Sequence, residues 1–188
     1  MLEDFKAQAP DAVCEWTSVN VPRTMLINID KPPFDNPELR RAMTLAIDRD
    51  AFSKIINGGE KNIGALMLPP SSGVWGMPEE RLRTLPGYNP DVEKNRAEAR
   101  EIMKKLGYGP DNPLRTKIST RNIPSWRNPA VLLNSQLKEI WIDTELDIID
   151  TAQWYPKINR KDFTIGAVPI EAGVHAAFLN STLDGDAA

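Results

Sequence analysis

Two arginines and a tryptophan lie together in one short polar segment, Thr120–Asn128. The planar guanidinium of Arg121 or Arg127 can donate two parallel charge-assisted hydrogen bonds to a carboxylate, such as the one that ends a peptide. Trp126 can form an apolar wall beside it. The amino end of a helix starting at Pro129 would add positive potential. We predict a ligand site here; the alternative is an exposed basic loop around one half-buried ring.

A further candidate, Trp75, lies in a long irregular stretch, residues 60–88, that is rich in proline and glycine. Long coils are uncommon unless they pack on something or carry function. Trp75 could line a cleft or anchor the loop on its own domain, and anchoring is the favoured interpretation. Trp154 and Tyr155 fall on a short expected helix, and we assign them to the core and its rim.

Enzymatic chemistry finds little support in the residues. His175 is the only histidine and Cys14 the only cysteine, so no Ser/His/Asp triad, Cys/His pair, internal disulfide or Cys/His zinc site is expected. Glu79 and Glu80 are adjacent carboxylates in a loop, where solvation is the favoured state. No glycine pair is followed by the Gly-Lys-Ser/Thr of a phosphate-binding loop. The sequence predicts a protein that is not an enzyme and uses no cofactor or metal.

The charge pattern argues against some classes of binding partner. The net charge is −3 with a pI of about 5.3, and the lysines and arginines form no basic block, which argues against nucleic acid and anionic membranes. No apolar run approaches the ~20 residues of a membrane span. The stretch Met1–Pro10 lacks the charged start and apolar run of a signal peptide. We expect either a cytoplasmic protein or a mature or excised piece of an exported one.

Hydrophobic periodicity predicts alternating strands and helices in an α/β fold with a partly parallel sheet. Asn36 and Pro37 suit the cap and first position of a helix, and Gly107 suits the end of another. The expected strands span residues 24–29, 114–120, 144–149 and 163–168. The expected helices span residues 37–47, 52–56, 90–106, 129–140 and 152–159.

Four of these segments carry a family resemblance. The helix Leu39–Arg49, which reads LRRAMTLAIDR, is similar to a signature helix of the bacterial solute-binding proteins of family 5, the peptide-binding type that serves ABC importers. The segments Leu26–Asn36, Pro86–Asp91 and Leu133–Leu146 resemble other parts of the same family. Trp141 stands where the family usually has glycine, so we expect that turn to be altered locally.

The resemblance covers roughly residues 10 to 170 and implies one lobe of a two-lobe, type II periplasmic-binding-protein-like fold, a mixed sheet flanked by helices. We assign residues 1–174 to this lobe and residues 175–188 to a tail unlike the family, artificial or disordered. In the family's signature helix, Arg40, Arg41 and Arg49 are expected to be structural, paired with neighbouring acidic residues.

The resemblance also implies partners. It predicts a periplasmic parent protein that binds a peptide or similar solute between two lobes by hinge motion and presents it to an ABC permease. It places cleft contacts near the segment 120–128, where some relatives carry arginine. One lobe would supply half the contacts, so we expect weak or no binding by this chain alone. An exposed lobe face could also drive homodimerisation. The alternative is a stand-alone protein-interaction module that uses its tryptophan-bearing loops.

Overall fold

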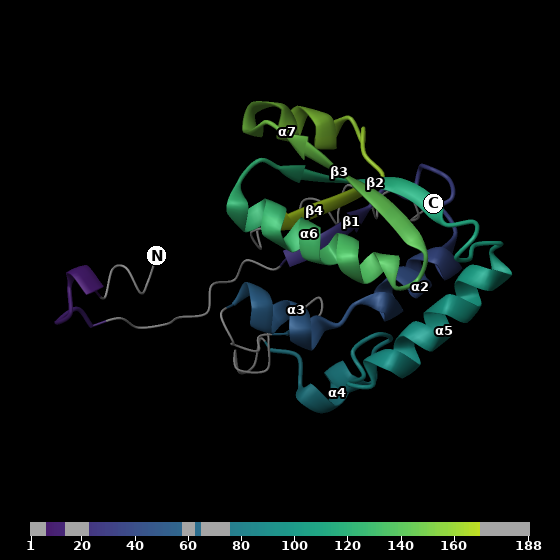
Figure 1. Cartoon of the computed structure of the whole chain (residues 1–188), viewed down its shortest axis with the longest axis horizontal. Helices are drawn as coiled ribbons and strands as arrows, with labels where there is room; N and C mark the ends of the chain where they lie inside the picture. The colour runs from purple at the N-terminus through teal and green to yellow at the C-terminus, as the bar shows by residue number, and fades with distance from the viewer. Residues whose placement is uncertain (1–6, 14–22, 58–62, 65–75, 170–188) are drawn as a thin grey trace.

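The computed structural model describes residues 7–13, 23–57, 63–64 and 76–169, and it contains one four-stranded mixed sheet (Figure 1). The strands are β1 (Arg23–Ile27), β2 (Leu114–Arg121), β3 (Ile142–Ile149) and β4 (Ile165–Pro169). Their order across the sheet is β1-β4-β2-β3. Strand β2 runs parallel to both β3 and β4, whereas β1 is antiparallel to β4. The predicted α/β fold with a partly parallel sheet is confirmed.

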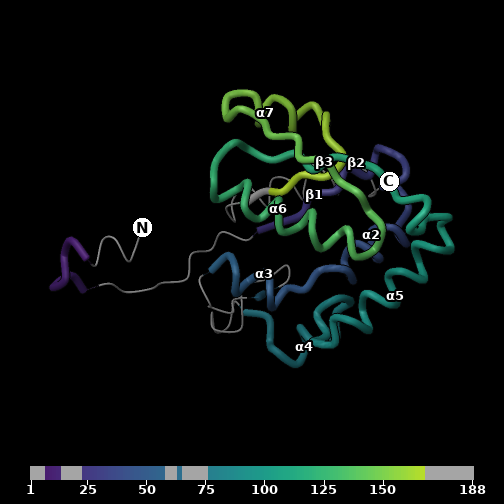
Figure 2. Tube along the Cα trace, viewed as in Figure 1, coloured from purple at the N-terminus to yellow at the C-terminus, as the bar shows by residue number. Residues whose placement is uncertain are grey.

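Helices cover both faces of this sheet. They are α2 (Pro37–Ala46), α3 (Arg49–Ile56), α4 (Glu79–Arg83), α5 (Val92–Lys105), α6 (Pro124–Lys138) and α7 (Thr151–Asn159). Helix α6 lies on one face and packs in turn on α2 and α3, while α5 packs along α2. Helix α7 lies on the opposite face, as the Cα trace in Figure 2 shows. None of the helices in the described residues is long and apolar enough to span a membrane.

The alternation of side chains along the strands divides the core into two clusters. Met25 and Ile27 of β1 pack on the α6 side of the sheet, in the larger cluster. Leu26, between them, points to the α7 side and packs with Trp154 and Phe163. Trp154 is only 2% exposed, which confirms its predicted place in the core.

Helix α2 begins as its sequence predicts. Asn36 Oδ1 accepts a hydrogen bond from the Glu38 backbone N–H at 2.9 Å, and Pro37 occupies the first helical position. Helix α5 begins slightly later than predicted, because Asp91 acts as the cap and accepts from the Lys94 N–H. Local capping chemistry therefore sets both starts.

The predicted start of the next helix at Pro129 is wrong. Helix α6 begins at Pro124, and Pro129 lies buried inside it. Both prolines fit the first-position rule, so local sequence alone does not choose between them. Pro129 cannot donate to the Ser125 carbonyl, but Ser125 is exposed, so water can take that bond. As a result Trp126 lies in the first helical turn rather than in a loop.

Two further differences concern loops. Residues 60–88 were expected to be irregular throughout, yet the described part of this stretch contains the short helix α4. The turn after α6 keeps a left-handed backbone although Trp141 stands where glycine is expected, with a φ of 63°. The Trp141 ring is half-buried against the larger core cluster, which offsets the strain of that conformation.

Candidate functional site

The carboxyl end of β2 carries an arginine held between two aromatic rings. The guanidinium carbon of Arg121 lies 4.6 Å from the ring centre of Trp126 on α6 and 5.9 Å from that of Tyr155 on α7. Its Nε is buried, and no atom within hydrogen-bond distance accepts from it. No carboxylate of the described residues pairs with this guanidinium. The rings thus fix an arginine that still has unused donors.

The rings themselves rest on the smaller core cluster. Trp126 meets Trp154 edge to face, with ring centres 5.3 Å apart and planes at 79°. Trp154 and Ile158 are buried one helical turn apart on α7, so Tyr155 between them points outward and is 53% exposed. Trp126 is therefore anchored, whereas Tyr155 forms an open rim beside Arg121.

The amino end of α6 adds positive potential near Arg121. Its N-cap, Ile123, provides no side-chain hydrogen bond, and the first turn contains no acidic residue. Arg127 lies in that first turn and is exposed. Helix amino ends carry partial positive charge, so an anion is favoured here. The sequence predicted this positive potential at a helix start at Pro129. The helix begins at Pro124 instead, so the potential lies at Pro124 and the residues that follow it.

A fourth positive group, Arg23, begins β1 at the same edge of the sheet. Arg23 lies opposite Pro169, the last residue of β4, because these strands are antiparallel. Its Nη1 donates to Asn57 Oδ1 at the end of α3, at 3.3 Å. Burial lowers the pKa of the Arg23 guanidinium below its ordinary value. Nothing in the local sequence marks this residue, so sequence reasoning missed it.

The structure brings together two of the four residues expected to bind a ligand. Arg121 and Trp126 are in contact, and Tyr155, which was assigned only to the rim of the core, joins them. Arg127 is exposed on the first turn of α6. Trp75 lies outside the described residues. Tyr155 could have been found from its position between two buried residues of an amphipathic helix.

A hollow of about 520 Å³ lies elsewhere, between α3, α4 and the start of α5. One of the two arginines that line it, Arg49, is tied to the main chain: its Nη1 donates to the carbonyl oxygens of Thr44 at 3.0 Å, Ile47 at 3.3 Å and Gly87 at 2.8 Å. The guanidinium also lies 4.0 Å over the Tyr88 ring. This hollow is open, and both of its arginines are used structurally, since Arg83 pairs with Glu79, so we do not place the ligand site there.

The other signature arginines are structural too, but their partners differ from those expected. Arg40 donates to the carbonyl oxygens of Phe34 and Asp35, and Arg41 pairs with Glu98 on α5. The expected partners were acidic residues close by in the sequence. Tertiary packing supplied backbone carbonyls and a distant carboxylate instead. In the described residues, no three His, Cys, Asp or Glu side chains gather as a metal site would require.

Comparison with known families identifies the chain. The profile described as "Bacterial extracellular solute-binding proteins, family 5 Middle" matches residues 2–179. The chain belongs to this family. The family 5 resemblance of the sequence is therefore confirmed, and its relatives are binding proteins rather than enzymes.

The relatives of this chain in family 5 include glutathione-binding proteins. The glutathione-binding protein GsiB of Salmonella choleraesuis is 29% identical over 139 residues, which are 74% of this chain and 25% of that protein. GsiB of Escherichia coli K12 is 27% identical over the same length. The chain thus spans about a quarter of the length of these relatives.

Solved structures share the fold of this family 5 chain. The murein tripeptide binding protein MppA of Escherichia coli matches with a TM-score of 0.69 at 19% identity, covering 91% of this chain and 33% of MppA. OppA of Haemophilus influenzae, in complex with the peptide RPPGFSPFR, matches with a TM-score of 0.67 at 20% identity, covering 81% and 29%. The predicted type II binding-protein architecture is confirmed by these likenesses.

Proposed function

We propose that this chain forms one wall of the solute site of a periplasmic binding protein that delivers peptides or similar solutes to an ABC permease. In this proposal Arg121 binds a carboxylate of the solute. The observation that supports it most is the state of Arg121, whose guanidinium is fixed between two rings while its donors lack an acceptor among the described residues. Because the Nε is buried, a carboxylate of the solute would bind the Nη groups of this guanidinium.

The place of Arg121 in the fold supports a ligand role. Ligands of open α/β sheets bind beyond the carboxyl ends of the parallel strands. Arg121 ends β2, and Ile149, its register partner, ends β3. The uncapped start of α6 lies next along the chain. A carboxylate arriving there would meet a guanidinium, the positive end of α6 and two aromatic faces.

The relatives support the class of solute. The named relatives include binding proteins for glutathione and for murein tripeptide, and one structure holds the peptide RPPGFSPFR. Each is a peptide or resembles one, and each carries a carboxylate. Because this chain spans about a quarter of such proteins, the remaining contacts would come from a second lobe. We infer that the chain alone binds its solute weakly, with a Kd on the order of millimolar.

Nuclear magnetic resonance can test this directly, because it detects millimolar binding. The chain has five tryptophans, so its proton–nitrogen spectrum should contain five indole signals, and Trp126→Phe identifies the one of interest. Titration with trialanine should shift the Trp126 signal, and trialanine amide, which lacks the carboxylate, should shift it much less. An equal response to both peptides would contradict the assignment of Arg121 as the carboxylate ligand.

The variant Arg121→Gln provides the second arm of this test. It should weaken trialanine binding about tenfold or more, since a charge-assisted bond contributes about 1.5–3 kcal/mol. Arg115→Gln is the matched control, because Arg115 lies on the same strand at its other end and is exposed. Submicromolar binding of trialanine by the chain alone would show that the site needs no second lobe.

A further inference from the structure

The surface of α7 beside Arg121 is apolar and exposed. Ala152, Tyr155 and Pro156 are spaced three and four residues apart, so they share one side of the helix, and all three are exposed. The Tyr155 ring is the largest of these groups, and its centre lies 5.9 Å from the guanidinium carbon of Arg121. An exposed apolar surface therefore adjoins the group that we assign to the carboxylate of the solute.

The direction of the Tyr155 side chain brings its ring to the carboxyl edge of the sheet. Helical side chains lean toward the amino end of the helix, over the residues three and four positions earlier. For Tyr155 these residues are Thr151 and Ala152, which are too small to cover an aromatic ring. The start of α7 follows the end of β3, and Arg121 ends the neighbouring strand β2. The open part of the ring and the guanidinium therefore lie at the same edge.

Trp126, the other ring in contact with Arg121, has less free surface. It is half-buried and meets Trp154 edge to face, with ring centres 5.3 Å apart. The Arg121 guanidinium carbon lies 4.6 Å from the Trp126 ring centre, closer than to that of Tyr155. Among the described residues, none forms a hydrogen bond with the Tyr155 hydroxyl. Tyr155 is therefore the ring at this site that remains open to a solute.

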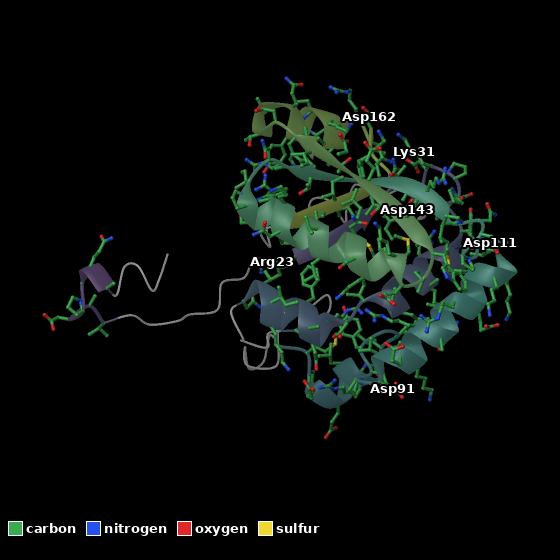
Figure 3. The ribbon with its side chains drawn as sticks, in the orientation of Figure 1. Arg23, Lys31, Asp91, Asp111, Asp143 and Asp162 are labelled. Atoms are coloured by element: carbon green, nitrogen blue, oxygen red, sulfur yellow. The ribbon has the colours of Figure 1, made fainter. Side chains whose placement is uncertain are left out.

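The charged groups on and around α7 are engaged elsewhere. The first charged residue of the helix is Lys157, whose Nζ lies 3.2 Å from a carboxylate oxygen of Asp147 and 3.7 Å from one of Asp162. Figure 3 shows Asp162 and Lys31 beyond the carboxyl end of α7, where they form an ion pair of 3.8 Å. Asp150, before the helix, accepts from a backbone N–H of the first turn. The described part of α7 thus presents an apolar surface to the site.

We propose that Tyr155 determines specificity, and that it selects solutes in which the residue carrying the carboxylate also has an aromatic side chain. This inference rests on the proposed function and specifies which solutes the site prefers. In the last residue of a peptide, the side chain and the carboxylate branch from the same carbon atom. A carboxylate held by Arg121 therefore brings that side chain to the adjoining surface of α7, where an aromatic ring can stack on Tyr155.

Two tripeptides of the same composition test the inference. Ala-Ala-Phe places its ring beside the terminal carboxylate, and Phe-Ala-Ala places it at the other end, so charge and hydrophobicity are matched. We expect Ala-Ala-Phe to bind the chain about fivefold more tightly, which corresponds to about 1 kcal/mol, the size of an aromatic pair. The readout is the titration of the Trp126 indole signal. Equal affinities for the two peptides would overturn the inference while leaving the role of Arg121 intact.

Variants of Tyr155 test the residue itself. Tyr155→Ala should remove the preference for Ala-Ala-Phe and leave binding of Phe-Ala-Ala unchanged, while Tyr155→Phe keeps the ring and should keep the preference. Gln153→Ala is the matched control, because Gln153 is exposed on another side of α7. Tyr155 is exposed, so these variants should fold, and circular dichroism checks that they do.

Two outcomes would refute the role of Tyr155 in specificity. One is a preference for Ala-Ala-Phe that survives Tyr155→Ala. The other is an equal loss of binding for both peptides in that variant, which would mean that Tyr155 only positions Arg121.

The variant Arg121→Gln separates this inference from the proposed function. It should weaken both peptides, since both keep the terminal carboxylate. Binding of both peptides unaffected by Arg121→Gln would refute the proposed function. Binding that depends on Arg121 but shows no preference between the peptides would refute only the role of Tyr155.

Discussion

Arg49 and Arg121 both lie over an aromatic ring, but only Arg49 uses its hydrogen-bond donors within the fold. Each guanidinium lies over a ring, that of Tyr88 in one case and that of Trp126 in the other. Arg49 donates to three main-chain carbonyl oxygens and ties the end of α2 to the loop before α5. Arg121 has a buried Nε with no acceptor.

This difference separates structural arginines from ligand-binding ones better than sequence does. An arginine whose donors are used by the fold stabilises the fold and has little left for a solute. An arginine held in position without acceptors is a weak contributor to stability and a ready receptor for an anion. Substitutions at the two sites should therefore give opposite patterns of stability and binding.

The largest expected effect lies on the structural side, at Gly87, whose carbonyl accepts from Arg49. Gly87 has a φ of 76°, and a side chain there would overlap the main-chain oxygen of Thr44. Gly87→Ala should lower the free energy of unfolding by about 2–4 kcal/mol, measured by urea denaturation. Gly109→Ala is the control, because a Cβ at Gly109 meets open space. Equal costs for the two variants would mean that the Gly87 loop can rearrange.

Loss of Arg49 itself should be the next largest effect. Arg49→Gln removes three hydrogen bonds and a cation–π contact, so we expect a loss of about 2 kcal/mol of stability. Binding of trialanine by the folded variant should not change. The control Arg81→Gln replaces an exposed arginine of α4 and should leave the free energy of unfolding unchanged. If Arg49→Gln weakened binding as much as Arg121→Gln, the distinction between the two arginines would fail.

A smaller effect is expected at the left-handed turn after α6. Trp141→Gly and Trp141→Ala both remove the half-buried ring, but only glycine adopts a φ near 63° without strain. The glycine variant should be more stable than the alanine variant by about 1 kcal/mol. Thermal unfolding of the two proteins side by side measures this difference. An alanine variant as stable as the glycine variant would show that the turn relaxes when the ring is removed.

The smallest effect on stability is expected at Arg121. Arg121→Gln loses cation–π contacts of about 0.5–1 kcal/mol, but it also removes a buried donor without an acceptor, which recovers a similar amount. Urea denaturation should give a change within about 0.5 kcal/mol, although trialanine binding falls about tenfold. A large loss of stability at Arg121 would place it among the structural arginines and break the comparison.

Some errors in the sequence-based predictions have a common origin. Pro124 and Pro129 satisfy the same rule for a helix start, and only the packing of α6 on the sheet decides between them. Trp141 keeps a backbone that glycine would favour because its ring packs against the core. The local preference was equal for the two prolines and unfavourable for Trp141. In both cases tertiary contacts decided the outcome.

The sequence by itself determined the order of the strands and of the helices other than α4, the cap at Asn36 and the family, because periodicity, capping and motifs are properties of neighbouring residues. It also drew attention to Arg121 and Trp126. Only the tertiary structure decided which arginine is satisfied. The acceptor at Gly87 is 38 residues from Arg49, and Arg23 and Arg121 reach one edge only because β4 pairs with both β1 and β2. Whether a donor finds an acceptor depends on groups that folding brings together.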